Sequence, residues 1–218
     1  MMTRKVVAGV VVLFALAFVS RQAASQTGKE PTKDKPAPAG DKKPGMSEQE
    51  AAAMQDYMKL AAPGDAHKKL EPLIGKWNHT SKVWVAGPGS TPMESSGTTE
   101  RKWILGGRYI MEEHKGQLMG MPHEGLGLTG YDNFRNMYTS SWCDNMGTAM
   151  LTMKGSCDPW GKTFTYYGEM DEPGIKITGR MVEYVTKIID NDKYVFEIID
   201  LHAGDNYKVV EVTYTRVK

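Results

Sequence analysis

The sequence of 218 residues has little of several features that usually reveal a function. It contains only two cysteines, and its 27 Lys and Arg residues balance 26 Asp and Glu residues to a formal net charge of +1. A charge this close to zero gives no general electrostatic hold on a phosphate backbone, so we expect no nucleic-acid partner. Only one long apolar run is present, near the start, and the mean hydropathy of -0.45 excludes a polytopic membrane protein.

Short catalytic motifs are also missing. The chain has no G-x-S-x-G, C-x-x-C or H-E-x-x-H pattern, and its histidines lie without metal-ligand spacing at positions His67, His79, His114, His123 and His202. We therefore favour a protein without enzymatic activity and predict no catalytic residue, no metal and no cofactor. Two alternatives stay open: copper held by Met119, Met121 and His123, and haem with His123 or His202 as the axial ligand.

One nucleotide-binding pattern is present in the wrong context. Residues Gly125 to Gly130 match G-x-G-x-x-G, but the run continues into a Tyr-Asp-Asn turn and a further strand, with no helix N-terminus to hold a pyrophosphate. We therefore interpret the alternating glycines as a kinked strand, or as a place where a ligand or another part of the chain comes close.

The first 46 residues indicate export followed by a spacer. Arg4 and Lys5 precede an apolar stretch from Val6 to Val19 and small residues at 23–25, which is typical of a signal peptide at 1–25. We expect cleavage, a secreted or periplasmic protein and no stable membrane span; an uncleaved anchor is the alternative. Residues 26–46 are rich in proline and lysine and predict a disordered linker.

A short amphipathic helix is predicted over residues 47–62. Ser47 and Glu50 form a capping box, and the apolar residues at 54, 57, 58 and 61 recur at helical spacing before Pro63. We expect this face to pack on the following domain, and a lid or docking helix is the alternative.

From residue 65 to the end, the pattern is that of an all-β domain. Nine turn signals separate ten strands, with intervals too short for crossover helices, which predicts an antiparallel meander. Because a sheet of ten twisted strands rarely stays open, we expect closure into a lipocalin-like barrel. The clearest predicted strands are Trp77–Val85, Arg108–Lys115, Met137–Cys143, Thr163–Glu169, Ile175–Val185, Tyr194–Leu201 and Lys208–Val217.

Several motifs in this domain resemble a known family. The run from Leu70 to Trp77 is similar to the short helix and Gly-x-Trp strand that open lipocalin-like and calycin barrels, in which the Trp fills the closed end. The segments at 106–109, 124–132, 142–148 and 212–216 resemble the DUF1579 family over about residues 65–218. This resemblance implies a β-barrel and carries no activity. His123 departs from it, because an aromatic residue is expected beside the glycine pair.

The two cysteines are expected to remain unpaired. If residues 144–147 turn a hairpin, Cys157 lies about nine residues along the return strand from Cys143, roughly 30 Å away at about 3.3 Å per residue. A disulfide needs Cα atoms about 4.4 to 6.8 Å apart. We therefore predict two separate free thiols, even in an oxidising compartment.

The predicted barrel has a width that suits one small ligand. From strand parity we predict that five residues line its interior, with Arg180 as a partner for a carboxylate or for Glu113: Tyr109, Trp142, Thr165, Arg180 and Tyr214. We therefore predict an exported binding protein for a small, mainly apolar molecule. The alternative is a structural or protein-interaction module of the cell envelope, with a packed core and no ligand.

Overall fold

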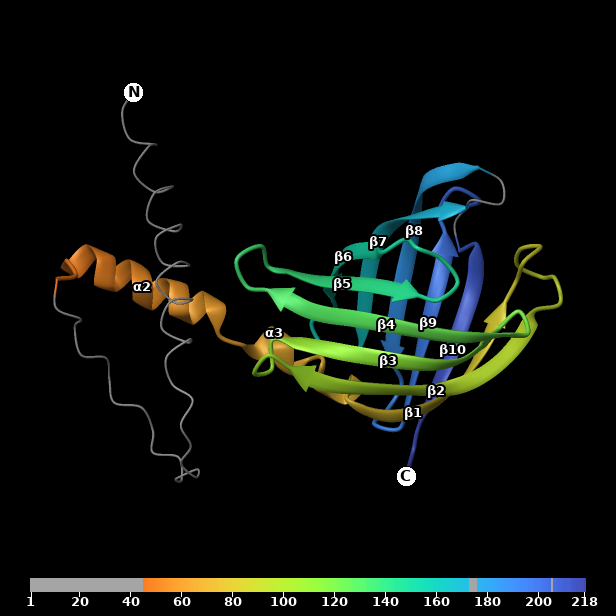
Figure 1. Ribbon diagram of the computed structural model, residues 1–218, viewed down its shortest axis with the longest axis horizontal. Coiled ribbons are helices and arrows are strands. Elements are labelled where there is room, and N and C mark those ends of the chain that lie inside the picture. Colours follow the sequence, from red (N-terminus) through yellow and green to blue (C-terminus); the bar gives the residue numbers. More distant parts are fainter. Residues whose placement is uncertain (1–44, 173–175, 205) are drawn as a thin grey trace. The chain divides into compact units, whose positions relative to one another are not determined.

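The computed structural model describes residues 45–172, 176–204 and 206–218 (Figure 1). The predicted signal peptide at 1–25 and all but the last two residues of the predicted linker at 26–46 lie outside the described residues. The chain divides into two units, residues 1–46 and 47–218. Among the described residues, no helix is long and apolar enough to cross a membrane.

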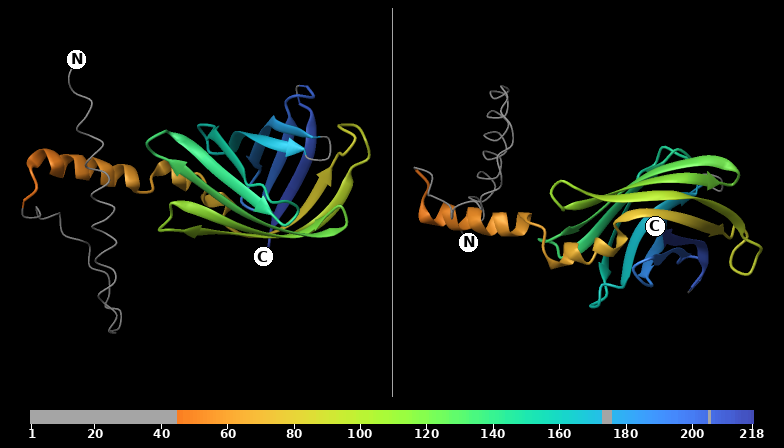
Figure 2. Two further views of the ribbon diagram at one scale, coloured as in Figure 1. Left: turned by 45° about the horizontal axis from the view of Figure 1, so that its top comes forward. Right: turned by 90° about the horizontal axis from the view of Figure 1, so that it is seen from below.

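The second unit is a closed barrel of ten antiparallel strands, as the turn pattern predicts. Each strand pairs with its neighbours in sequence, and β1 closes the barrel against β10. In Figure 2, β3 to β5 form one wall and β7 to β10 form the opposite one. The strands are β1 (Gly75–Val83), β2 (Met93–Ile104), β3 (Tyr109–Leu118), β4 (Met121–Asp132), β5 (Met137–Asp144), β6 (Leu151–Cys157), β7 (Thr163–Glu172), β8 (Ile177–Ile188), β9 (Lys193–Asp200) and β10 (Lys208–Arg216).

Two short helices cover one end of the barrel, which we call the closed end. They are helix α3 (Asp65–Lys68) and the 3-10 helix η2 (Glu71–Leu73), and they bury Leu70, which lies between them, and Leu73. The hydroxyl of Tyr138 donates to the carbonyl of Ala66 at 2.8 Å, which ties this segment to β5. Figure 1 shows α3 beside the ends of β3 and β4. The other end of the barrel has no such cover among the described residues and is called the open end.

The Gly-x-Trp motif has the structural role that its sequence predicts. Gly75 has a φ of 127°, a left-handed conformation that favours glycine, and a Cβ there would collide with the side chain of Arg216. Trp77 is 1% exposed, and its indole N–H donates to the carbonyl of Leu73 at 3.0 Å. The guanidinium of Arg216 lies 4.0 Å from the Trp77 ring and donates to the carbonyls of Ile74 and Pro72. These contacts close the barrel between β1 and β10.

Helix α2 (Glu48–Ala61) begins at the predicted capping box, with Ser47 as its N-cap and Glu50 bonded back to it. The expectation that its apolar face packs on the barrel is wrong, because no residue of α2 is buried. Its C-terminal end is held by the amide of Asn133, which donates to the carbonyls of Leu60 and Ala62 at 2.8 Å each.

Candidate functional site

The inward side chains differ between the two ends of the barrel. Near the closed end they are large and buried, and Trp77, Phe164 and Tyr194 are each at most 1% exposed. Toward the open end several of the inward apolar side chains are only partly buried. These half-buried apolar residues pack against the core and are Trp142, Leu151, Met170, Phe196, Ile198 and Val210. We call this part of the interior the chamber.

Three of the five predicted lining residues face the interior. Trp142 faces the chamber, Tyr214 lies 4% exposed in the core, and Arg180 shares the inward face of β8 with the fully buried Val182. These three residues come from β5, β8 and β10, which the closed barrel arranges around its interior.

The other two predicted lining residues point outward. Tyr109 and Thr165 each neighbour a buried inward residue, Ile110 and Phe164, and successive side chains alternate between the faces of a strand. Residues of the same parity do share a face on these two strands, but the face that carries Tyr109 and Thr165 is the outer one. Tyr109 instead lines an outer hollow of about 430 Å³ together with Leu60 of α2.

The predicted partner of Arg180 is also corrected. Glu113 faces outward and pairs with Lys102 at 2.8 Å. Arg180 instead forms ion pairs with Asp200 and, at 3.2 Å, with Glu172, so its charge is already matched by two carboxylates from the chain itself. A carboxylate ligand therefore finds no free positive charge at this residue.

Sequence reasoning missed a second charged pair deeper in the barrel. Nη2 of Arg101 on β2 lies 2.7 Å from Oε2 of Glu112 on β3, and the two residues are direct cross-strand partners. The Arg101 and Glu112 side chains keep 11% and 14% of their surface accessible to water. Only the register, which places position 101 opposite position 112, reveals the contact.

Three histidines that are scattered in the sequence meet on one wall of the barrel. The rings of His79 and His114 are stacked at 4.3 Å, and the ring of His123 meets that of His114 edge-on at 4.9 Å. The Thr99 hydroxyl lies 3.3 Å from Nδ1 of both His79 and His114. Because a hydroxyl has a single proton, at least one of these imidazoles must donate its own Nδ1 proton to Thr99.

Glycines make room for these rings. Gly97 and Gly116 are paired across β2 and β3, and a Cβ on them would lie 2.7 and 3.2 Å from the His79 ring. Gly125, in the G-x-G-x-x-G run, has the same role, because its Cβ would lie 2.2 Å from the Trp142 ring. The alternating glycines therefore mark a place where a tryptophan of the neighbouring strand comes close.

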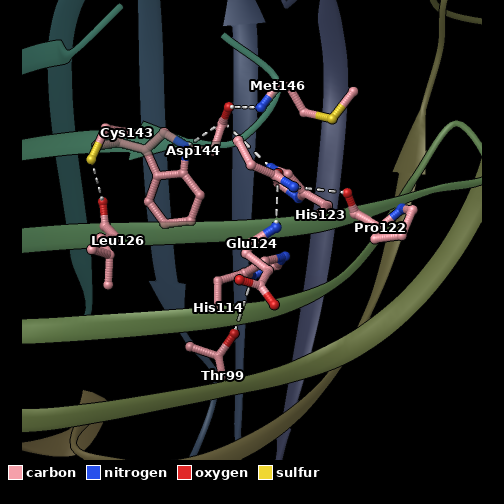
Figure 3. Close-up of polar contacts among 11 residues, drawn as sticks. Thr99, His114, Pro122, His123, Glu124, Leu126, Cys143, Asp144 and Met146 are labelled. Atoms are coloured by element: carbon pink, nitrogen blue, oxygen red, sulfur yellow. Dashed lines mark hydrogen bonds and ion pairs between the residues drawn. The ribbon is translucent and has the colours of Figure 1, made fainter. Parts of the chain in front are cut away.

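At the open end, Asp144 joins Trp142 and His123. One Asp144 carboxylate oxygen accepts from the Trp142 indole at 2.8 Å and lies 3.4 Å from Nε2 of His123, while the other accepts from the backbone of Met146 at 2.9 Å. Figure 3 shows His123 and His114 side by side, with Asp144 next to His123 and Thr99 next to His114. The hydrogen bond to Asp144, two residues further along β5, fixes the orientation of the Trp142 ring.

Burial controls the protonation of this wall. It lowers the pKa of His79 to about 4 and that of His114 to about 3, with further lowering by the neighbouring histidines. Burial alone would raise the pKa of Asp144, but its hydrogen bonds from Trp142 and Met146, together with the nearby His123 ring, lower it overall. At neutral pH the wall thus presents His79 and His114 as uncharged rings beside an ionised carboxylate.

Several buried polar atoms inside the barrel have no hydrogen-bond partner among the described residues. Such atoms are uncommon in folded proteins, and each needs an explanation such as a bound water or a ligand. They are Arg101 Nε, His123 Nε2, Arg180 Nε, Tyr184 Oη and Tyr194 Oη.

The residues proposed for copper and haem differ in their surroundings. Met119 and Met121 are 53% and 49% exposed at the β3–β4 turn, whereas the His123 side chain is largely buried beside Asp144. Nε2 of His202 accepts the backbone N–H of Met181 at 3.0 Å. Within residues 45–172, 176–204 and 206–218 there is no group of three His, Cys, Asp or Glu side chains placed to hold a metal ion.

Both cysteines are free, as predicted, with Cys143 on β5 and Cys157 on β6. Cys143 approaches the carbonyl of Leu126 on the neighbouring strand, with 3.9 Å between sulfur and oxygen. Burial raises the pKa of the Cys157 thiol to about 11, which keeps it protonated and unreactive at neutral pH.

One solved structure supports this fold. The crystal structure of Rv2717c from M. tuberculosis is similar with a TM-score of 0.51 at 14% identity, covering 72% of this chain and 100% of that one. A redesigned beta barrel, b11L5F_LGL, matches with a TM-score of 0.36 at 13% identity, covering 70% and 96%. A search of curated proteins finds no match. The family model described as "Protein of unknown function (DUF1579)" matches residues 62–216, so the chain belongs to this family.

Proposed function

We propose that this protein is an exported, non-enzymatic binding protein that holds a small, mainly apolar ligand in the chamber. The observation that carries the proposal is the half-buried state of the inward side chains at the open end. A packed barrel would fill its own interior, whereas here Arg101 and Glu112, deep between the strands, keep part of their side chains accessible to water.

The chemistry of the chamber walls supports a flat and largely apolar ligand. One wall carries the rings of His79, His114 and Trp142, and the facing strands contribute Met170 and Phe196. Ring faces and thioether groups bind aromatic and apolar surfaces well. Arg101 and Arg180 are paired with carboxylates of the chain itself. They therefore offer polar groups that orient a ligand without presenting an unmatched charge.

Native mass spectrometry of residues 26–218, purified without detergent, tests this function. We expect a reproducible small-molecule adduct that solvent extraction removes, and we expect Trp142→Ala to lose it. Trp160→Ala is the matched control, because Trp160 is 81% exposed in the turn between β6 and β7. A bare chain mass, unchanged after incubation with fatty acids, haem, Cu(I) and flat aromatic compounds, would remove the support for binding.

A second candidate is a structural or protein-interaction module. Tyr57 and Met58 of α2 are 66% and 61% exposed, and Phe134 in the turn after β4 is 76% exposed. Tyr57 and Phe134 line the same outer hollow, and a contiguous exposed apolar patch is typical of an interaction surface. A chain that binds no small molecule but forms a complex that is lost in Tyr57→Ser and Phe134→Ser would favour this alternative.

A further inference from the structure

The outer hollow gathers aromatic side chains that the proposed function does not use. It lies where the C-terminal end of α2 meets the turn before β3 and the turn after β4. Its volume of about 430 Å³ lies within the range of small-molecule sites. The four aromatic residues that line it, two of them exposed and two half-buried, are Tyr57, Phe134, Tyr109 and Tyr131.

The walls of the outer hollow are held in place by contacts within the chain. The amide of Asn133 donates to two carbonyls at the end of α2, at 2.8 Å each, and so joins the helix to the turn after β4. The ring of Tyr131 meets the ring of His67 edge-on at 5.9 Å and that of Tyr138 at 4.7 Å. The hollow is therefore formed before any ligand arrives.

The buried side chain of His67 supplies a hydrogen-bond donor to this hollow. His67 is 4% exposed, and its Nδ1 accepts from the backbone N–H of Gly64 at 3.1 Å. Burial and the nearby charge of Arg108 lower the pKa of His67, so at neutral pH the uncharged ring carries its one proton on Nε2. This N–H has no acceptor among the described residues, and it is not one of the enclosed partnerless atoms. It therefore opens to the hollow that His67 lines.

Arg108 brings a positive charge to the same hollow. Its Nη1 donates to the carbonyl of Leu105 at 3.2 Å, and its guanidinium forms no ion pair within residues 45–172, 176–204 and 206–218. The carboxylate of Asp132, which also lines the hollow, is already paired with Arg135 at 2.9 Å. Unlike Arg101 in the barrel interior, Arg108 thus keeps its charge unmatched.

The two donors and the rings together restrict the type of ligand. A carboxylate has two acceptor oxygens and one negative charge, so it can accept from His67 Nε2 while it matches the charge of Arg108. The aromatic rings favour a flat apolar body beside that group. A neutral hydrocarbon would fill the hollow but leave both donors to water.

We propose that the outer hollow is a second ligand site, which binds a flat aromatic compound with one carboxylate: the ring system lies among the aromatic side chains, and Arg108 and His67 bind the carboxylate. This site goes beyond the proposed function, because it lies outside the barrel and does not involve the chamber. It also places the recognition of a carboxylate at Arg108 and not at Arg180, where the sequence predicted it.

Two probes of the same shape test the inference by isothermal titration calorimetry. They are 2-naphthoate, which is charged, and 2-naphthamide, which is neutral. We expect 2-naphthoate to bind at least about fivefold more tightly, because hydrogen bonds to an ionised acceptor are roughly twice as strong as neutral ones. Arg108→Gln should reduce this ratio to about twofold or less. Lys193→Gln is the matched control: it removes the same charge from an exposed position on β9, in the opposite wall, and should leave the ratio unchanged.

Phe134→Ser tests the aromatic part of the site. Because Phe134 is 76% exposed, its replacement should not disturb the fold, and it should weaken both probes by about threefold or more without changing their ratio. Trp160→Ala, which removes an exposed ring from the turn between β6 and β7, should weaken neither probe.

The outcomes separate this inference from the proposed function. Equal affinities of the two probes, or an unchanged ratio in Arg108→Gln, would overturn the inference. Binding that persists in Phe134→Ser and Arg108→Gln but is lost in Trp142→Ala would place the probes in the chamber, which overturns the inference and supports the proposed function. If neither probe binds the natural protein, the inference fails, whereas the proposed function is decided by the adduct in native mass spectrometry and its loss in Trp142→Ala.

Discussion

The stacked pair His79 and His114 should make the barrel sensitive to mild acid. In the folded protein their pKa values are about 4 and 3, below the ordinary 6.5, because burial disfavours the charged ring. The unfolded chain therefore binds more protons than the folded one as the pH falls below about 6.5. The stability that these residues contribute is complete above that pH and is lost as the pH falls toward 4.

The size of this loss follows from the same values. One pKa unit corresponds to about 1.4 kcal/mol. Between pH 7 and pH 5 each ring stays neutral in the folded protein and becomes protonated in the unfolded chain, which lowers the unfolding free energy by about 2 kcal/mol per ring. The two would give about 4 kcal/mol. Because the His114 ring is only half-buried, solvent screening reduces its share, and we expect a total of about 3 kcal/mol.

Urea unfolding followed by circular dichroism at a series of pH values from 5 to 7.5 measures this effect. The groups facing the pair are His123, Arg101 and Asp144, and they remain in place in the variant His114→Gln. This variant should lose about half of the pH dependence, while its stability relative to the natural protein is constant above pH 7. An equal slope in both proteins would refute the assignment of the acid sensitivity to the stacked rings.

Three further predictions concern packing and thiol chemistry. Trp77→Ala should lower the unfolding free energy by about 3 to 5 kcal/mol in urea titrations, and a melting temperature shifted by only a degree or two would contradict its role in closing the barrel. Gly125→Ala should displace the Trp142 ring, cost about 1 to 3 kcal/mol and change the tryptophan fluorescence, whereas Gly147→Ala, where the nearest atom to a new Cβ is 4.0 Å away, should do neither. Both cysteines should be alkylated in denaturant without a reductant, as mass spectrometry would detect, and failure to label them would mean that they are bridged.

The sequence was most informative where local patterns and the fold agree. Turn residues at short intervals and alternating side chains predicted ten antiparallel strands, and the exposed edges of such a sheet predicted closure. Gly75 and Trp77 could be interpreted from the sequence because a left-handed glycine and a buried indole act through neighbours close along the chain.

The candidate site was only partly predictable. Parity correctly separates the two faces of a strand, but it does not say which face is inside, so Tyr109 and Thr165 were assigned to the wrong face while Trp142 was not. The apolar face of α2 was expected to be covered, yet periodicity shows only that a helix has such a face and not what lies against it.

The sequence by itself determined the strands, their order and the two unpaired thiols, because these depend on short-range geometry. Only the tertiary structure decided which charges and rings meet inside the barrel. Arg101 with Glu112, and His79 with His114, are brought together by cross-strand register and by glycines that leave room for rings. Register arises from the packing of all ten strands at once, so no local pattern contains it.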